Sequence, residues 1–284
     1  MNGSDRSAIT RRLRELGVRP SKRLGQNFLH CEHVIAAMVD AARSFEPETV
    51  IEIGPGLGAL THGLAEVSAR VVAVEIDGRL AEELSAATAD RASIQVIRGD
   101  IRDVRIAAFT GGAQAVVVGS IPYRISADIL RWLVRSREAV RGAVLLTQRE
   151  VAQKILDSPG RRGSALGVFV QAYACPEALQ AVPRHCFCPV PEVDSLLWRM
   201  TWREVPAFTA SEERFFALVR ALYGSRRKML RAALQPARGA GHVAEALSAA
   251  GIDGERRGET LTLTELDRLA VAWEDRARIA GKRS

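Results

Sequence analysis

Short apolar runs rich in β-branched residues recur along the first half of the chain, and stretches with helical spacing separate them. Runs of this kind predict strands at residues 50–54, 71–77, 94–99, 115–121 and 142–147. The intervening stretches predict helices at residues 59–67, 78–89 and 126–136. Strands that alternate with helices in this way predict a parallel sheet with helices on both of its faces.

The pattern changes in the second half of the chain. Residues 166–173 and 195–202 predict two more strands, which we expect to form an antiparallel pair at the sheet edge. After Trp202 the apolar residues recur at helical spacing, and Thr262 with Glu265 predicts a capping box that opens a last helix. We therefore expect an α/β domain at residues 1–204 and a small all-helical domain at residues 205–284.

Length and composition are typical of a globular protein. The 284 residues suffice for one α/β domain and a smaller second domain, and 47% are hydrophobic while 26% are charged. No apolar run approaches the roughly 20 residues that span a bilayer. The arginine-rich start does not resemble a signal peptide, and Asp5 with Glu15 argues against a transit peptide. We expect a cytoplasmic protein without a membrane partner.

Positive charge is concentrated in two segments of the chain. The net charge is +7, and residues 1–23 and residues 203–238 each carry a net charge of +5, so the remainder is acidic. Clusters of Lys and Arg are typical of surfaces that bind nucleic acid. A solubilising surface is the alternative that charge alone leaves open.

The four cysteines are Cys31, Cys175, Cys186 and Cys188. Residues 185–188 contain a histidine and two cysteines, but no second pair with the spacing of a structural zinc site follows elsewhere. We expect reduced thiols, as in a cytosolic protein, and no metal.

Glycines and acids follow the predicted strands in an order that indicates a cofactor site. Gly54 and Gly56 lie where the first strand meets its helix, but Ala59 replaces the third glycine of a dinucleotide-binding loop. Glu75 ends the second strand, where an acid can hold the hydroxyls of a ribose. Asp100 follows the third strand and can accept from an adenine amine. These features suit S-adenosylmethionine better than a cofactor with a pyrophosphate.

Residues 119–123 follow a buried strand and form a site suited to a flat base. Ser120 and nearby carbonyls can accept hydrogen bonds from an exocyclic amine, Pro122 stiffens the turn, and Tyr123 offers a stacking face. This chemistry is typical of enzymes that take a base out of its stack before reacting with it.

Four segments of the chain together resemble one family. Residues 19–29 resemble its N-terminal signature, residues 187–195 its later aromatic-and-proline motif, and residues 226–231 the basic helix of its C-terminal domain. The glycine loop with Glu75 and Asp100 matches its cofactor positions. From about residue 9 to residue 273, the chain is similar to the KsgA family of rRNA adenine dimethyltransferases.

The resemblance implies a fold, a reaction and a set of residues. The fold is a Rossmann-like, seven-stranded methyltransferase sheet with a small all-helical C-terminal domain. The reaction is two successive methylations of each of two adjacent adenines in small-subunit rRNA, on an immature ribosomal subunit, by a monomer. The implied cofactor contacts are Asn27, Leu29, Gly54, Glu75, Asp100 and Ser120. The implied catalytic group is Ser120 with Tyr123 and Phe187 around the target adenine, and the implied RNA contacts are Arg226, Arg227, Lys228 and Arg231.

The chain departs from the family pattern at two positions. Ser120 stands where the family has asparagine, so one short hydroxyl replaces a carbonyl acceptor and an amide donor. Glu192 stands where a basic residue is usual. Two alternatives stay open: a large-subunit rRNA methyltransferase of the macrolide-resistance type, and an assembly factor that binds pre-ribosomes without methylating them.

Overall fold

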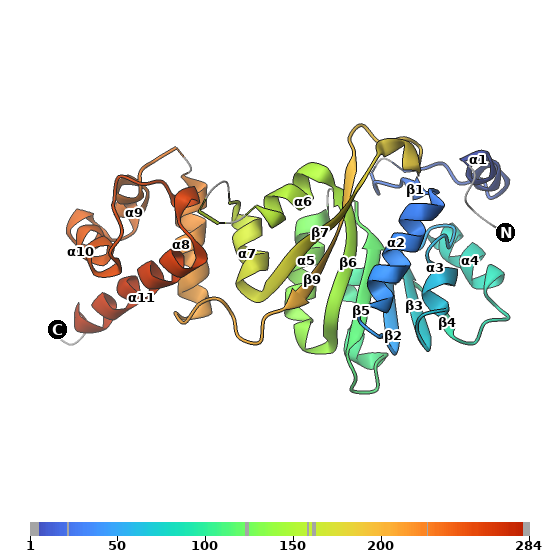
Figure 1. Ribbon diagram of the computed structural model, residues 1–284, viewed down its shortest axis with the longest axis horizontal. Coiled ribbons are helices and arrows are strands. Elements are labelled where there is room, and N and C mark those ends of the chain that lie inside the picture. The colour runs from blue at the N-terminus through green and yellow to red at the C-terminus, as the bar shows by residue number, and fades with distance from the viewer. Residues whose placement is uncertain are drawn as a thin grey trace. The chain divides into compact units, whose positions relative to one another are not determined.

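The computed structural model describes residues 6–21, 23–122, 125–157, 159–160, 163–225 and 227–280, and it describes their side chains except at 237–238 and 274–280. The chain divides into two compact units (Figure 1). The first comprises Met1–Ala152 and Glu177–Trp202, and the second comprises Gln153–Pro176 and Arg203–Ser284.

A seven-stranded sheet forms the first unit, in the order β4-β3-β2-β5-β6-β9-β7. The strands β2 to β6 pair in parallel, and β9 pairs antiparallel with β6. The bounds are β2 Thr49–Ile53, β3 Arg70–Glu75, β4 Ile94–Arg98, β5 Ala115–Ser120, β6 Val140–Gln148, β7 Ala174–Val182 and β9 Ser195–Trp202. This confirms the predicted fold class and the five predicted parallel strands.

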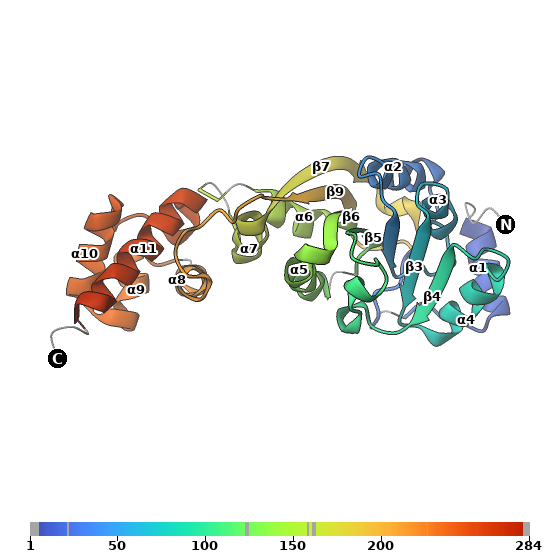
Figure 2. The same cartoon turned by 90° about the horizontal axis from the view of Figure 1, so that it is seen from below.

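Helices cover both faces of the sheet. The helices α2 (Glu32–Arg43) and α3 (Thr61–Ala65) lie on one face, and α4 (Gly78–Ala87) and α5 (Ser126–Arg135) lie on the other (Figure 2). Parallel strands that are buried on both faces consist of nearly continuous apolar residues, and every residue of β2 is buried. The core between α2, α3 and the sheet includes Met38, Leu64, Val116 and Val144.

The N-terminal segment packs beside this sheet. Helix α1 (Arg6–Glu15) buries Ile9 and Leu13 in a small cluster with Phe28 and Leu80. Strands β1 (Phe28–Leu29) and β8 (Phe187–Cys188) pair antiparallel as a separate two-stranded sheet. The segment with the N-terminal signature is thereby joined to the segment with the aromatic-and-proline motif.

The strand predicted at residues 166–173 is wrong, because these residues form helix α7 (Ala165–Tyr173) after α6 (Arg149–Leu156). The Ser164 hydroxyl caps α7 by accepting from the amide of Gly167. Residues on several sides of α7 are buried, and a short apolar run does not distinguish a buried helix from a strand by periodicity. The edge strand next to β9 is instead β7.

Among the described residues, four α-helices follow Trp202 in the second unit: α8 (Glu212–Gly224), α9 (Leu230–Arg238), α10 (Ala240–Ala250) and α11 (Leu263–Ala280). Phe208 and Phe216 pack against Phe169 and Tyr173 of α7, at ring centroid separations of 5.4 to 5.9 Å, and Phe215 stacks on Phe208 at 4.7 Å. These contacts explain why residues 153–176, which the sequence analysis places in the first domain, pack with the second unit.

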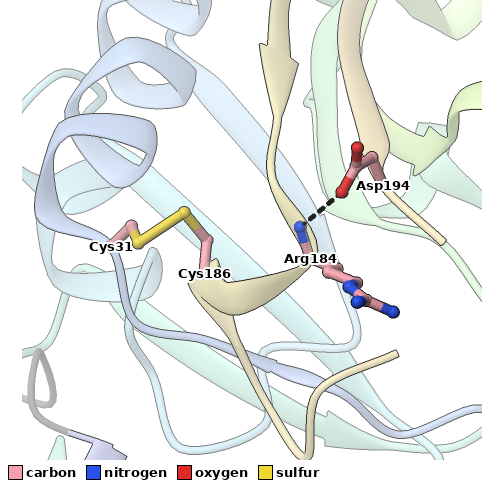
Figure 3. Close-up of a disulfide and its surroundings, with 4 residues drawn as sticks. All are labelled: Cys31, Arg184, Cys186 and Asp194. Carbon is pink, nitrogen blue, oxygen red and sulfur yellow. Dashed lines mark hydrogen bonds between the residues drawn. A yellow bond between two sulfur atoms is a disulfide. The ribbon is translucent and has the colours of Figure 1, made fainter. Parts of the chain in front are cut away.

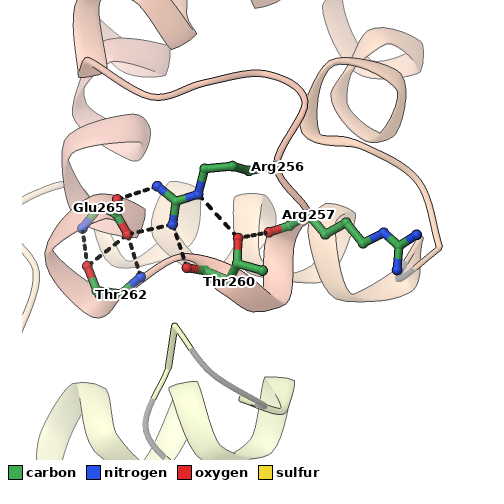
Figure 4. A network of polar contacts seen from close by, with 5 residues as sticks. All are labelled: Arg256, Arg257, Thr260, Thr262 and Glu265. Atoms are coloured by element: carbon green, nitrogen blue, oxygen red, sulfur yellow. Dashed lines mark hydrogen bonds and ion pairs between the residues drawn. The ribbon is translucent and has the colours of Figure 1, made fainter.

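The predicted capping box opens α11. The Thr262 hydroxyl accepts from the amide of Glu265 at 3.2 Å, and the Glu265 carboxylate accepts from the amide of Thr262 at 2.8 Å (Figure 4). The same carboxylate binds the Arg256 guanidinium. This ion pair lowers the pKa of Glu265 to about 2. No helix of the described residues has the length and apolar character that a membrane span requires.

The cysteines differ from the expectation of reduced thiols. Cys31 and Cys186 form a disulfide between the start of α2 and the residue before β8, with a Cα–Cα distance of 5.0 Å (Figure 3). Cys175 and Cys188 are free. The two bridged residues are 155 positions apart in sequence, and it is the pairing of β1 with β8 that brings them together.

Candidate active site

A cavity of about 890 Å³ lies at the carboxyl ends of the parallel strands. These ends share one edge of the sheet because the strands run in the same direction, and ligands of such sheets bind there. The cavity is lined by all six residues expected to contact the cofactor: Asn27, Leu29, Gly54, Glu75, Asp100 and Ser120. Phe187 lines it as well, whereas Tyr123 lies outside the described residues. The structure thus gathers seven predicted site residues, whose roles stay predictions.

The glycine loop after β2 needs glycine for different reasons at different positions. Gly54 has a φ of +64°, and a Cβ there would meet no described atom within 4 Å, so its surroundings leave room for a ligand. At Gly56 a Cβ would lie 3.1 Å from the Phe28 ring. At Gly58 it would lie 2.7 Å from a methyl group of Leu84, so Gly58 permits close packing against α4.

Glu75 at the end of β3 is tied to the glycine loop. Its carboxylate accepts from the amide of Gly56 at 3.0 Å and from the amide of Asp77 at 2.9 Å. Burial raises the pKa of Glu75, and these two hydrogen bonds oppose that shift. Each carboxylate oxygen has a second lone pair. The side chain can therefore accept from a pair of ribose hydroxyls without releasing the loop.

Asp100 after β4 is paired with an arginine that the sequence analysis did not consider. Its carboxylate accepts from Nε and Nη2 of Arg102 at 2.9 and 2.6 Å, and also from the Arg102 amide at 2.9 Å. The hydrogen bond from the Arg102 side chain lowers the pKa of Asp100. Asp100 is thus an ionised acceptor at the cavity wall. An arginine two residues after the acid is the sequence signal that could have indicated this pair.

Glu52 is a second residue that the sequence analysis did not assign. It precedes the glycine loop in β2, is 1% exposed, and accepts from the Thr61 hydroxyl at 2.7 Å. Burial raises the pKa of Glu52 to about 8; nearby Glu75 adds to the shift, and the bond from Thr61 opposes it. Glu52 is therefore mostly protonated at pH 7. A carboxyl residue inside an otherwise apolar strand is the sequence signal that could have indicated a buried acid here.

The turn expected to hold the target base lies at the end of β5. Ser120 is half-buried, and the amide of the following Ile121 donates to the carbonyl of Leu146 in β6 at 2.8 Å. A Cβ on Gly119 would lie 2.8 Å from the side chain and carbonyl of Ile53, so only glycine fits there. Phe187 is 3% exposed and lines the cavity from β8.

The residues expected to bind RNA belong to the second unit. Arg227 and Lys228 are exposed in the connection between α8 and α9, and Arg231, in the first turn of α9, pairs with Glu255. Arg226 lies outside the described residues. The implied basic helix is therefore wrong for residues 227–229, because α9 begins only at Leu230.

The donor set of the cavity suits a nucleoside cofactor. Glu75 and Asp100 present carboxylate oxygens at the ends of β3 and β4, and the open space around Gly54 lies at the end of β2, the neighbour of β3. Within the described part of the chain, no group of three or more His, Cys, Asp or Glu side chains could hold a metal ion.

The sheet order and the glycine loop define the class of Rossmann-like methyltransferases. A solved 23S rRNA methyltransferase, ErmE, has the same fold with a TM-score of 0.71 and 29% identity, over 87% of this chain and 100% of that one. A dimethyladenosine transferase from Plasmodium falciparum has the fold with a TM-score of 0.74, over 88% of this chain and 98% of that one, at 22% identity.

The sequence then gives the family. The profile of the ribosomal RNA adenine dimethylase family matches residues 18–270, and the chain belongs to this family. Two similar relatives are called ribosomal RNA small subunit methyltransferase A. The protein from Kineococcus radiotolerans is 39% identical over 94% of this chain and 90% of its own length. The protein from Anoxybacillus flavithermus is 38% identical over 91% of this chain and 92% of its own length.

Proposed function

We propose that this protein transfers methyl groups from S-adenosylmethionine to the exocyclic amines of two adjacent adenines in small-subunit rRNA. The observation that carries the proposal is the gathering of the six expected cofactor residues and Phe187 around one cavity. The names of the relatives support the choice of small-subunit rRNA over other substrates.

Different residues of the expected cofactor set would bind different parts of the cofactor. Glu75 would accept from the ribose hydroxyls and Asp100 from the adenine amine, while Asn27, Leu29 and Gly54 would complete the wall. When bound, S-adenosylmethionine supplies a methyl group that its sulfonium already activates. The chain therefore needs no metal and no strong base for this chemistry.

The remaining task of the site is to hold the target amine in line with the methyl group. The Ser120 hydroxyl and carbonyls of its turn would accept from the amine, which keeps the nitrogen lone pair from delocalising into the ring. Phe187 and Tyr123 would stack on the base and hold it at attack distance. After transfer the excess proton of the nitrogen can pass to solvent, so no residue is assigned as a general base.

The second unit would provide the contact with the ribosomal substrate. Arg226, Arg227, Lys228 and Arg231 would bind rRNA phosphates, and the target would be an immature small subunit in the cytoplasm, bound by a monomer. Exposure of Arg227 and Lys228 supports this assignment. Contacts of this kind make affinity depend on salt, since each neutralised phosphate releases counterions.

A large-subunit rRNA methyltransferase is the second candidate function. The fold match with ErmE, at 29% identity over 87% of this chain, is the observation that favours it. A third possibility, an assembly factor without methyltransferase activity, rests on Ser120 in place of asparagine.

One methylation assay separates these functions. Purified protein and labelled S-adenosylmethionine are incubated with small subunits or large subunits that lack the modification, and the rRNA nucleosides are then separated. Dimethyladenosine at two adjacent small-subunit positions is the expected result. Label only in the large subunit would support the second candidate. Tight binding to small subunits without any product would support the assembly factor.

A further inference from the structure

The cavity wall beside Ser120 carries a glutamine to which no role has been assigned. Gln148 is the last residue of β6 and lines the cavity. Ser120 is paired with Leu146 in the parallel register, and Gln148 lies two residues beyond Leu146, so all three side chains project from one face. The bond from the Ile121 amide to the Leu146 carbonyl fixes the two strand ends relative to each other.

The other neighbours of Gln148 belong to the expected base site. In the antiparallel register Gln148 is paired with Ser195 of β9, which places both side chains on the same face. Ser195, Pro191 and Phe187 line the same cavity. Gln148 therefore lies between Ser120, the residue expected to hold the target amine, and Ser195, and it shares the cavity wall with Phe187, the residue expected to stack on the target ring.

The amide of Gln148 is available to a ligand. The residue is half-buried, and its side-chain amide makes no hydrogen bond to any of the described residues. Most polar groups in such positions are bonded to the protein or to water. A glutamine amide offers two N–H donors and a carbonyl acceptor in one plane, which suits the edge of a flat base.

We propose that Gln148 is a specificity-determining residue that donates a hydrogen bond to ring nitrogen N1 of the target adenine. The inference rests on the proposed function and deepens it. In adenine, N1 is bonded to the carbon that carries the exocyclic amine. When Ser120 binds that amine, the neighbouring side-chain amide of Gln148 therefore lies close to N1. In adenine N1 accepts a hydrogen bond, whereas in guanine N1 carries a proton and would repel the same donor. The contact thus favours adenine over the other purine.

The contact has particular value for the second methyl transfer. The adenine amine has two N–H donors before the first transfer and only one before the second. Ser120 and the neighbouring carbonyls therefore lose half of their hydrogen bonds to the amine. N1 remains an acceptor throughout, so Gln148 can hold the base equally in both transfers. Removal of its amide should make the protein stop at monomethyladenosine more often.

The test combines a protein variant with single-atom changes in the substrate. Wild type and Gln148→Ala are assayed on small subunits whose target adenines are natural, 1-deazaadenosine (N1 replaced by C–H) or 7-deazaadenosine. We expect Gln148→Ala to lower kcat/KM on natural adenine roughly 10- to 100-fold, the range for one buried hydrogen bond. The 1-deaza change should lower wild-type kcat/KM to the same extent, but should have no further effect on the variant. The 7-deaza change should affect neither protein strongly.

Two controls separate this inference from the proposed function. Gln95→Ala, at an exposed position of the edge strand β4, should behave as wild type. The dissociation constant for S-adenosylmethionine, measured by calorimetry, should be unchanged in Gln148→Ala.

Three outcomes would overturn the inference. The first is a further loss of kcat/KM when Gln148→Ala acts on 1-deazaadenosine, equal to the product of the two separate losses. This would show that the amide does not contact N1. A weaker cofactor affinity in Gln148→Ala would mean that the residue supports the cofactor part of the cavity. Wild type that fails on natural adenine would refute the proposed function itself, and the inference with it.

Discussion

Replacing Glu52 by glutamine should make the stability of the first unit less dependent on pH. Glu52 is 1% exposed, and its pKa is about 8 in the folded protein against an ordinary value of 4.5. Between these two pH values the folded state holds a proton that the unfolded state releases. Stability therefore decreases as the pH rises from about 4.5 to about 8, and it is constant above that range.

The size of the effect follows from the shift. Between the two pKa values, each unit of rising pH lowers the free energy of unfolding by about 1.4 kcal/mol. From pH 5 to pH 8 the free energy of unfolding should fall by about 3 to 4 kcal/mol through Glu52 alone. Glutamine has nearly the same shape, carries no charge, and keeps an oxygen that can accept from Thr61. The variant should thus match wild type near pH 5 and exceed its stability by several kcal/mol at pH 8.

The assay is urea unfolding monitored by tryptophan fluorescence at several pH values. Trp132, Trp198 and Trp202 all belong to the first unit, so their signal reports on the sheet that contains Glu52. Glu48→Gln, which changes an exposed carboxyl just before β2, is the matched control and should parallel wild type. If wild type and Glu52→Gln differ by a constant amount from pH 5 to pH 8, Glu52 is ionised throughout and the reasoning is refuted.

Three further perturbations test other parts of the structure. Gly119→Ala should destabilise the first unit by about 1 to 3 kcal/mol, because its Cβ would overlap β2, and should weaken cofactor binding; unchanged urea unfolding would contradict this. Glu265→Gln should lower the free energy of unfolding of the second unit by about 2 kcal/mol at pH 7. The difference from wild type, measured by urea unfolding, should shrink as the pH falls from 5 towards 2, because only the ionised carboxylate of Glu265 is stabilised by Arg256. Alkylation of the unfolded, unreduced protein should modify two of the four cysteines and leave Cys31 and Cys186 unmodified, whereas modification of all four would show that the bridge is absent.

The fold could be predicted where local sequence and global structure require the same residues. Buried parallel strands need continuous β-branched residues, and each such run in residues 50–147 became a strand. Residues 166–173 are apolar because their helix is buried among aromatic side chains. Their burial depends on Phe208 and Phe216, which follow at least 35 residues later, so local periodicity could not distinguish the two structures.

The site was predicted where it depends on positions along single strands. Gly54, Glu75 and Asp100 each follow one strand, and a parallel sheet brings such positions to one edge. The Cys31–Cys186 bridge and the position of Gln148 depend instead on strand pairing and register. Neither pairing nor register can be determined from one sequence without knowledge of which segments meet.

The distribution of charge gives the two proposed binding events different environments. The chain has a net charge of +7, yet the described residues that line the cavity include five acids, Glu75 and Asp100 among them, and only three arginines. A positively charged cavity would repel a sulfonium cofactor, whereas the rRNA backbone requires positive charge outside the cavity. The carboxyl groups at the strand ends suit the sulfonium cofactor, and the arginines of the second unit suit the rRNA backbone. Because Glu52 is mostly protonated near pH 7, the free cavity avoids a second negative charge beside Glu75, and a bound cation would favour release of that proton.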